Sequence, residues 1–250
     1  MIKRCSKILK IDLHIHSIHS GHAYGTIYDI INNASKKKLK MIAITDHGPS
    51  MIGSACKIHF AVGKRAPKDH KGMKILWGCE ANILNAKGDI DLDEQLIKKL
   101  DFILVGIHKK TPFKNLGKTK NTKALINCFK KYPIHAFAHP TTFYFEYDLK
   151  KVCQAACDNN ILLELNSASL NRLDTNHPKE NLERLKTMAN IAKKNNKKLI
   201  VNSDAHFLNE IGDDKLLKKY MKLLNITKKD IINNYPKELD KFIEEKNKLN

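Results

Sequence analysis

The sequence predicts an α/β fold in which parallel strands close into a barrel. Seven short apolar runs alternate with amphipathic, lysine-rich segments, which is the pattern of repeated strand–helix units. The length of 250 residues suits one barrel domain, and an apolar share of 42% is enough for a sizeable core. Metal-binding types of side chain follow most of the apolar runs, and only in a closed barrel do the strand ends share one rim. A doubly wound open sheet is the alternative.

The apolar runs set the expected strands, and the amphipathic segments set the helices between them. The first strand begins the segment of residues 11–25, and the helical spacing of Ile27, Ile30 and Ile31 predicts a helix behind the capping residue Thr26. The remaining strands are expected over residues 40–45, 74–78, 102–107, 134–138, 161–165 and 199–202. The remaining helices are expected around residues 57–64, 94–100, 121–131, 149–158 and 179–195.

A helical extension is expected after the last strand. Residues from about 213 to 250 contain two or three helical segments, best defined over 227–233 and 236–246, with Thr227 and Pro236 as helix starters. No internal repeat, flexible linker or low-complexity segment interrupts the chain. We therefore expect residues 1–250 to form a single barrel domain with the C-terminal helices packed on it.

The chain carries a strong excess of positive charge. Its formal net charge is +19, from 45 lysine and arginine residues against 26 acidic ones, which suits polyanionic partners such as nucleic acid or phosphorylated metabolites. Only four of the basic residues are arginine, whereas nucleic-acid readers favour arginine with interleaved aromatic residues. The sequence therefore allows nucleic acid as a partner but does not favour it.

Composition and segment lengths indicate a cytoplasmic protein without a membrane anchor. Residues 1–10 are basic and lead directly into a strand, unlike a signal peptide, and no apolar run reaches the length of a membrane span. The cysteines lack the paired spacing of a thiolate zinc site and are mostly in apolar contexts. They are expected as reduced core thiols at Cys5, Cys56, Cys79, Cys128, Cys153 and Cys157. The sequence does not indicate an oligomeric state.

The most unusual stretch is residues 11–25, in which four histidines fall within nine residues. Side chains alternate along a strand, so His14 and His16 point to the same face and can chelate one metal ion. His19 and His22 follow in a loop that can fold back over the same strand end. On its own the motif is better explained by chance than by function.

The other strand ends supply further candidate ligands. Histidine or carboxylate side chains follow the second, third, fourth, fifth and seventh strands. The complete set of candidate metal ligands is His14, His16, His22, His47, Glu80, His108, His139, Asp204 and His206. Nine nitrogen and oxygen ligands exceed the four or five that one zinc ion takes. The set therefore suits two or three ions with bridging carboxylates.

Acidic residues beside the candidate ligands suit supporting roles. Asp12 precedes His14 and Asp46 precedes His47, so each acid can orient a ligand by a hydrogen bond or add negative charge. Other histidines lie in loop or basic contexts, or at the amino end of a strand. Those expected to be structural or solvated are His59, His70, His135 and His177.

Six motifs in a fixed order resemble those of the polymerase and histidinol phosphatase (PHP) family of metal-dependent phosphoesterases. They are DLHIHS, ITDHGP, GCEANI, VGIH, FAHP and NSDAH, and they lie between Ile11 and His206. The HAY sequence after the first loop, together with the TDHGP and GCEANI forms of two motifs, is similar to the YcdX-like phosphatase branch.

The resemblance implies a distorted (β/α)7 TIM-like barrel with a trinuclear metal centre. Zinc is the commonest metal in the family, with manganese or iron in some members. Carried over motif by motif, the three ligand sets would be His14, His16, Glu80 and Asp204; then His108 and His139 with Glu80 as a bridge; and finally His22, His47 and His206.

Clustered divalent ions generate hydroxide from water near neutral pH and neutralise phosphate oxygens. The expected reaction is hydrolysis of a small phosphate monoester by direct in-line attack of a metal-bridging hydroxide, without a covalent enzyme intermediate. The residues expected to be catalytic through that hydroxide are Glu80, Asp204 and His206. His19 is a candidate substrate contact, and Lys64, Lys109 and Lys110 could attract an anionic substrate, although each fits an ordinary surface position better.

No serine or cysteine lies in a recognisable nucleophile motif, and Ser17 and Ser203 are expected as hydrogen-bonding residues at strand ends.

Three other functions stay open. A nuclease or exonuclease would apply the same chemistry to phosphodiesters in a wider cleft. An amidohydrolase barrel also begins with an HxH motif, but it usually needs a bridging lysine where this chain has Glu80. A non-catalytic metal-binding module would be expected to have lost some ligands.

Overall fold

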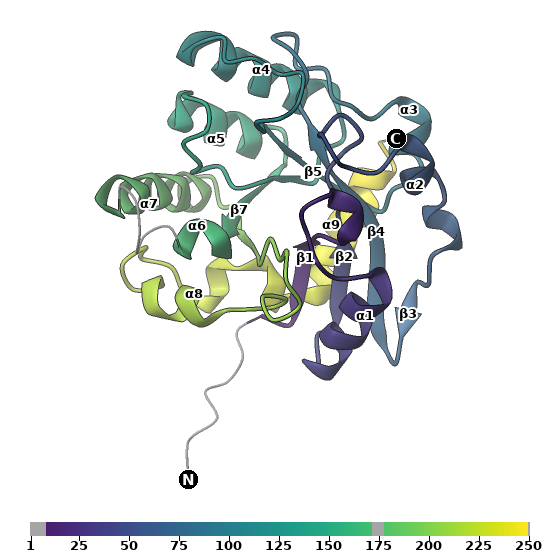
Figure 1. Cartoon of the computed structure of the whole chain (residues 1–250). Coiled ribbons are helices and arrows are strands. Elements are labelled where there is room, and N and C mark those ends of the chain that lie inside the picture. Colours follow the sequence, from purple (N-terminus) through teal and green to yellow (C-terminus); the bar gives the residue numbers. More distant parts are fainter. Residues whose placement is uncertain (1–8, 172–177, 250) are drawn as a thin grey trace.

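The fold is an α/β barrel of parallel strands with helices on its outside (Figure 1). The computed structural model describes residues 9–171 and 178–249. Within them, seven parallel strands follow one another in the order β1, β2, β4, β5, β6, β7 and β8. An additional two-residue strand, β3 (Asp69–His70), pairs antiparallel with β4. The predicted barrel is therefore confirmed, and the open sheet is not observed.

The barrel strands lie close to their expected positions. Their bounds are β1 (Ile11–Ile15), β2 (Met41–Ile44), β4 (Met73–Asn82), β5 (Phe102–Gly106), β6 (Ala136–Phe137), β7 (Leu162–Asn166) and β8 (Ile200–Asn202). Strand β4 is the main departure, because the sequence predicted that it would end before Glu80. It continues through Asn82 because its last five residues pair in register with β5. Glu80 therefore lies within a strand, where its backbone is fixed on both sides.

Helices connect the strands and cover the outside of the barrel (Figure 1). Their bounds are α1 (Ile27–Lys36), α2 (Lys57–Ala61), α3 (Glu94–Ile97), α4 (Lys118–Lys131), α5 (Leu149–Asp158), α6 (Ser167–Asn171), α7 (Pro178–Lys194), α8 (Lys215–Tyr220) and α9 (Pro236–Asn247). Thr26 caps α1 as predicted, in a reciprocal hydrogen-bonded box with Asp29. Pro236 occupies the first turn of α9, also as predicted.

The predicted helix over residues 227–233 is wrong. The segment forms two short 3-10 turns, Lys228–Asp230 and Ile232–Asn234. The reason is a competing partner, because Leu199 N donates to Asp230 O and Ile232 N donates to Leu199 O. The backbone of this segment pairs with the start of β8 instead of continuing its own helical hydrogen bonds.

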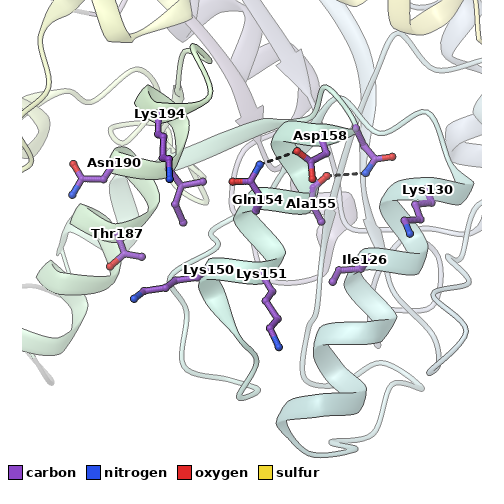
Figure 2. A pocket seen from close by; sticks show the side chains of 12 residues that line it. Ile126, Lys130, Lys150, Lys151, Gln154, Ala155, Asp158, Thr187, Asn190 and Lys194 are labelled. Carbon is purple, nitrogen blue, oxygen red and sulfur yellow. Dashed lines mark hydrogen bonds between the residues drawn. The ribbon is translucent and has the colours of Figure 1, made fainter.

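Helices α4, α5 and α7 lie beside one another on one flank, with a groove of about 800 Å³ between them (Figure 2). Four lysines line this groove, namely Lys130, Lys150, Lys151 and Lys194. Asp158 is the one acidic residue among the lining side chains, and its carboxylate accepts a hydrogen bond from Gln154. The groove is a basic surface feature on the helical layer, and its lining offers no cluster of metal ligands.

The barrel closes between β1 and β8 through few main-chain hydrogen bonds. Ile15 and Ala205 form a single parallel bridge at the carboxyl end. Nearer the amino end, a side chain replaces the main-chain partner: Asn202 Oδ1 accepts a hydrogen bond from Leu13 N at 2.9 Å.

A second asparagine closes the amino-terminal end of the same seam. The buried Asn233 side chain accepts from Val201 N and donates to Val201 O and to Ile11 O, at 2.6–3.0 Å. One amide thereby satisfies polar backbone groups of both strands.

Helix α9 seals the amino-terminal end of the barrel. Its side chains Leu239, Phe242 and Ile243 join the apolar cluster inside the strands. Lys246 is buried there and donates to Asn159 O at 2.9 Å. These contacts support the proposal that residues 1–250 form one domain with the C-terminal helices packed on the barrel.

Several smaller expectations can be compared with the structure. Four cysteines are buried as predicted, whereas Cys56 is exposed at the start of α2, and Cys5 lies outside the described residues. The side chain of Lys64 and all of His177 also lie outside them. Across the described part of the chain, no helix has both the length and the apolar character needed to cross a bilayer.

We expect Asn233→Ala to destabilise the fold by about 2–4 kcal/mol, because it leaves buried backbone groups of two strands without partners. Urea unfolding followed by circular dichroism measures the loss. Asn234→Ala is the matched control, since that side chain makes one exposed hydrogen bond to Lys228 O. Equal losses of stability in the two variants would contradict the role given to Asn233.

Candidate metal centre

The nine candidate ligands lie together at the carboxyl end of the barrel. One comes from β1 and one from β4. The others follow the ends of β1, β2, β5, β6 and β8 or, for His22, come from the loop after β1. The arrangement agrees with the expectation that the strand ends share one rim.

Glu80 occupies the centre of this group and is fully buried. Its Oε1 lies 2.7 Å from His139 Nε2 and 3.0 Å from His108 Nε2. Its Oε2 lies 2.7 Å from His47 Nδ1 and 3.4 Å from His14 Nε2. One carboxylate therefore contacts imidazoles from four different strand ends, as a bridging ligand would.

Asp204 provides the second carboxylate. Its Oδ1 lies 3.1 Å from His16 Nε2, 3.5 Å from His14 Nε2 and 3.7 Å from His206 Nδ1. Both Asp204 and His139 have positive φ angles, 55° and 32°. Such backbone conformations are costly for residues other than glycine and concentrate at functional sites.

Compact groups of three ligands can be recognised among the described residues. Within each group the ligand atoms lie within 4.8 Å of one another, and the groups are His14, His16 and Asp204; His47, Glu80 and His108; and His16, His47 and His206. His139 adjoins the second group through Glu80. His22 is exposed, and its ring centroid lies 4.8 Å from that of His206. The last of these groups therefore contains His16 at the place where the expected ligand set has His22.

Buried polar atoms without partners show that this cluster suits metal ions. His14 Nε2, His16 Nε2, His47 Nδ1 and Glu80 Oε2 are all buried, and none makes a hydrogen bond of acceptable geometry. Leaving one such group unsatisfied costs about 1–3 kcal/mol. Four of them facing one space are stabilised together by cations, which accept lone pairs from imidazole and carboxylate alike.

The protonation states of several groups in the site suit metal binding, although the carboxylates around His14 raise the pKa of that ring against the effect of burial. Burial, together with the neighbouring His47, lowers the pKa of His16 to about 3. Burial likewise lowers the pKa of His47. Although burial alone would raise the pKa of Glu80, the surrounding imidazoles of His108, His14 and His47 hold it well below its usual range. Neutral imidazoles and ionised carboxylates are the forms that bind divalent ions.

Glu164 supports the site and was missed by the sequence analysis, which treated its strand as an apolar run. The side chain is fully buried in β7, and its Oε1 lies 2.8 Å from His14 Nδ1. Its Oε2 accepts a hydrogen bond from His139 N at 2.7 Å. Glu164 thereby fixes the ring of His14 and the backbone of His139. A charged residue in the middle of a buried strand is the signal that could have found it.

Asn82 supports His108 in a similar way. Its Oδ1 lies 2.7 Å from His108 Nδ1, and its own amide donates to the buried carboxylate of Asp91 at 2.6 Å. Asn82 lies two residues after Glu80 on β4 and therefore points to the same face. Gly106 gives these rings room, because a Cβ there would lie 2.7 Å from His108 Cε1.

Asp46 supports His16 through the hydroxyl of Ser20. It was expected to support His47, the ligand that it precedes. Its Oδ1 accepts a hydrogen bond from Ser20 Oγ at 2.6 Å, and Ser20 Oγ lies 2.9 Å from His16 Nδ1. Its Oδ2 accepts from Ser17 Oγ and lies 3.1 Å from His59 Nε2. His59, expected to be structural or solvated, therefore holds the far side of this carboxylate.

Asp12 fastens two strand ends. Its carboxylate accepts hydrogen bonds from Ser203 N, Ser203 Oγ and Gly212 N at 2.6–3.0 Å. The contact fixes the backbone directly before Asp204. Ser17 and Ser203 both donate their hydroxyls to buried acids, as predicted for hydrogen-bonding residues at strand ends.

Comparison with known proteins gives the family. The model of the PHP domain matches residues 12–233. The chain belongs to the PHP family. It is 32% identical over 238 residues to a probable phosphatase of Photobacterium profundum, and the aligned residues cover 95% of each chain. It is 34% identical over 238 residues to a probable phosphatase of Thermoanaerobacter, which covers 95% of this chain and 96% of the relative.

Solved structures at low identity share the barrel fold. Histidinol phosphate phosphatase from Lactococcus lactis, complexed with zinc, L-histidinol and phosphate, superposes with a TM-score of 0.58 at 14% identity over 86% of this chain and 92% of that one. A chain of an archaeal ribonuclease P with mature tRNA gives a TM-score of 0.56 at 14% identity, over 94% and 91%. At this identity the likeness concerns the barrel alone.

A pocket of about 500 Å³ adjoins the candidate ligands of this PHP protein. Its lining includes the candidate ligands His47, His108, His139 and Asp204, together with Met51, Ile52, Lys109, Lys110, Thr142 and Tyr144. His19 is not among its lining residues. The ring of His19 lies instead on that of His59, with 4.4 Å between centroids, so its role as a substrate contact stays a prediction.

We expect Glu164→Gln to lower zinc affinity about 10- to 100-fold. Both carboxylate oxygens of Glu164 now face nitrogens, His14 Nδ1 and His139 N, and the amide NH₂ of glutamine could not accept a hydrogen bond from either of them. Competition with a fluorescent zinc chelator measures the change. Glu183→Gln, on the exposed face of α7, should leave affinity unchanged. Equal affinity in the two folded variants would show that Glu164 does not support the ligands.

Proposed function

We propose that this PHP protein is a metal-dependent phosphatase that hydrolyses small phosphate monoesters at a trinuclear centre. Its relatives carry the name of probable phosphatases, and a protein of the same fold binds zinc and phosphate. These comparisons support a hydrolase of phosphoric ester bonds. The observation that carries the proposal is the convergence of buried imidazole nitrogens and a carboxylate oxygen that lack hydrogen bonds within the chain.

The donor set suits zinc, with manganese or iron as alternatives, because it combines imidazole nitrogen with carboxylate oxygen and contains no thiolate. The motifs favour three ligand sets in which Glu80 bridges. They are His14, His16, Glu80 and Asp204; Glu80, His108 and His139; and His22, His47 and His206.

Bound divalent ions lower the pKa of water and neutralise phosphate oxygens. The chain's own groups hold and balance those charges, with Glu80 and Asp204 as the anionic ligands and His206 at the edge of the pocket. Ser17 and Ser203 are not free nucleophiles, since both donate their hydroxyls to buried acids. Burial raises the pKa of the Cys79 thiol well above its usual range. Direct attack by water-derived hydroxide is therefore the proposed reaction.

The other candidate functions have less support. The pocket of about 500 Å³ suits a small ester better than a polymer, although the net charge of +19 keeps a nuclease open to test. Glu80 stands where an amidohydrolase would need a bridging lysine. A non-catalytic module does not require a supporting layer as complete as that formed by Glu164, Asn82 and Asp46.

Removal of metal with a chelator should abolish hydrolysis of p-nitrophenyl phosphate, and added zinc or manganese should restore it. The same samples, incubated with labelled single-stranded DNA, separate a phosphatase from a nuclease. Full phosphatase activity in the chelated protein would overturn the metal mechanism. Faster cleavage of DNA than of phosphate monoesters would favour the nuclease.

Glu80→Ala should remove more than one equivalent of metal per chain, because a bridging carboxylate serves two ions. Elemental analysis after dialysis gives the count, with Glu94→Ala as a control on an exposed side chain at the start of α3. Retention of the full metal content by the folded Glu80→Ala protein would contradict the bridging assignment.

A further inference from the structure

Two lysines in the pocket have no function in the proposed hydrolysis. Lys109 and Lys110 follow directly on His108, are exposed and line the pocket of about 500 Å³. Neither forms an ion pair with an acidic side chain of the described residues. Their two positive charges therefore face the space that a substrate would enter.

The reacting phosphate does not need these charges. Three divalent ions would bring six positive charges to the centre, against the two carboxylates of Glu80 and Asp204 that lie among the ligands. A phosphate dianion held by such ions would already be neutralised. The lysines are therefore available for a different anionic group, farther from the reacting phosphorus.

The lysine pair is held in place by its surroundings. Thr111 Oγ1 donates to His108 O at 2.9 Å, and Ile52 N donates to Lys110 O at 3.1 Å, so the turn is fastened at both ends. Lys109 Nζ lies 5.1 Å from the centroid of the Tyr144 ring, within reach of a cation–π contact.

The wall that carries Tyr144 is itself braced from the helical layer. Arg184 of α7 donates to Thr141 O and Thr142 O at 3.3 Å, and its guanidinium lies 4.9 Å from the centroid of the Phe143 ring. The direction of Lys109 is thereby set by a fixed loop. The apolar side chains Met51 and Ile52 also line the pocket and suit contact with a carbon linker.

We propose that Lys109 and Lys110 bind a second anionic group, a phosphate or a carboxylate, on the leaving group of the phosphate monoester. The proposal rests on the phosphatase function and specifies its substrate class. The preferred substrates carry two anions on one short organic linker, one at the metal cluster and one at the lysines. Charge-assisted hydrogen bonds supply the attraction.

The test compares matched substrates that differ only in the second anion. Propyl phosphate, propanediol bisphosphate and carboxypropyl phosphate are hydrolysed by the zinc-loaded protein, and kcat/KM is measured for each. We expect at least one doubly anionic ester to exceed propyl phosphate by about tenfold. That ratio should disappear in Lys109→Met/Lys110→Met and persist in Lys109→Arg/Lys110→Arg.

A control separates local binding from general attraction by the net charge of the protein. Lys150→Met/Lys151→Met removes the same charge from the groove between α4, α5 and α7 (Figure 2), and it should retain the wild-type ratio. Equal loss of the ratio in both double variants would assign the effect to long-range electrostatics and overturn the proposal.

Calorimetry provides a readout that does not depend on turnover. Propane bisphosphonate, which cannot be hydrolysed, should bind the zinc-loaded wild-type protein about tenfold more tightly than the Lys109→Met/Lys110→Met variant. Two results together would overturn this inference alone. The wild-type protein would hydrolyse propyl phosphate as well as the doubly anionic esters, and the wild-type and variant proteins would bind the bisphosphonate with equal affinity. Failure of the wild-type protein to hydrolyse any ester would instead overturn the proposed function.

Discussion

The rest of the site depends on the burial of one carboxylate. Glu80 is fully buried near the carboxyl end of β4, and an ionised acid in such a place is unfavourable unless charges and hydrogen bonds surround it. Imidazoles from the ends of other strands satisfy this requirement, with His47, His108 and His139 within 3.0 Å. Because those imidazoles follow separate strands, β2, β5 and β6 have to assemble around β4 for Glu80 to be stable where it is.

A layer of hydrogen bonds behind the imidazoles decides which ring nitrogen faces the centre. Glu164 holds Nδ1 of His14, Asn82 holds Nδ1 of His108, and Ser20, itself bound by Asp46, holds Nδ1 of His16. In each case Nε2 is left to point at the carboxylates. This layer makes the donor atoms converge before any metal binds, which reduces the cost of ordering them.

The carboxyl end of the barrel carries the candidate ligands, whereas the amino end is packed for stability. Two histidines that flank β6, within five residues, show this contrast. His139, after its carboxyl end, contacts Glu80 at 2.7 Å. His135, before its amino end, accepts a hydrogen bond from Ile103 N and faces Phe242 of α9, and burial lowers its pKa to about 3. Chemistry is concentrated at the open end, while α9 and the asparagine seam stabilise the closed one.

The sequence by itself determined the alternation of strands and helices and the ligand types at the strand ends, because both depend on local periodicity and on the order of motifs. It could not determine the length of β4, the loss of the helix after Thr227 or the importance of Glu164. Each of these depends on a partner far along the chain: β5 for β4, Leu199 for the segment after Thr227, and His14, 150 residues away, for Glu164. Contacts at such separations leave no periodic signal, so only the tertiary structure decided them.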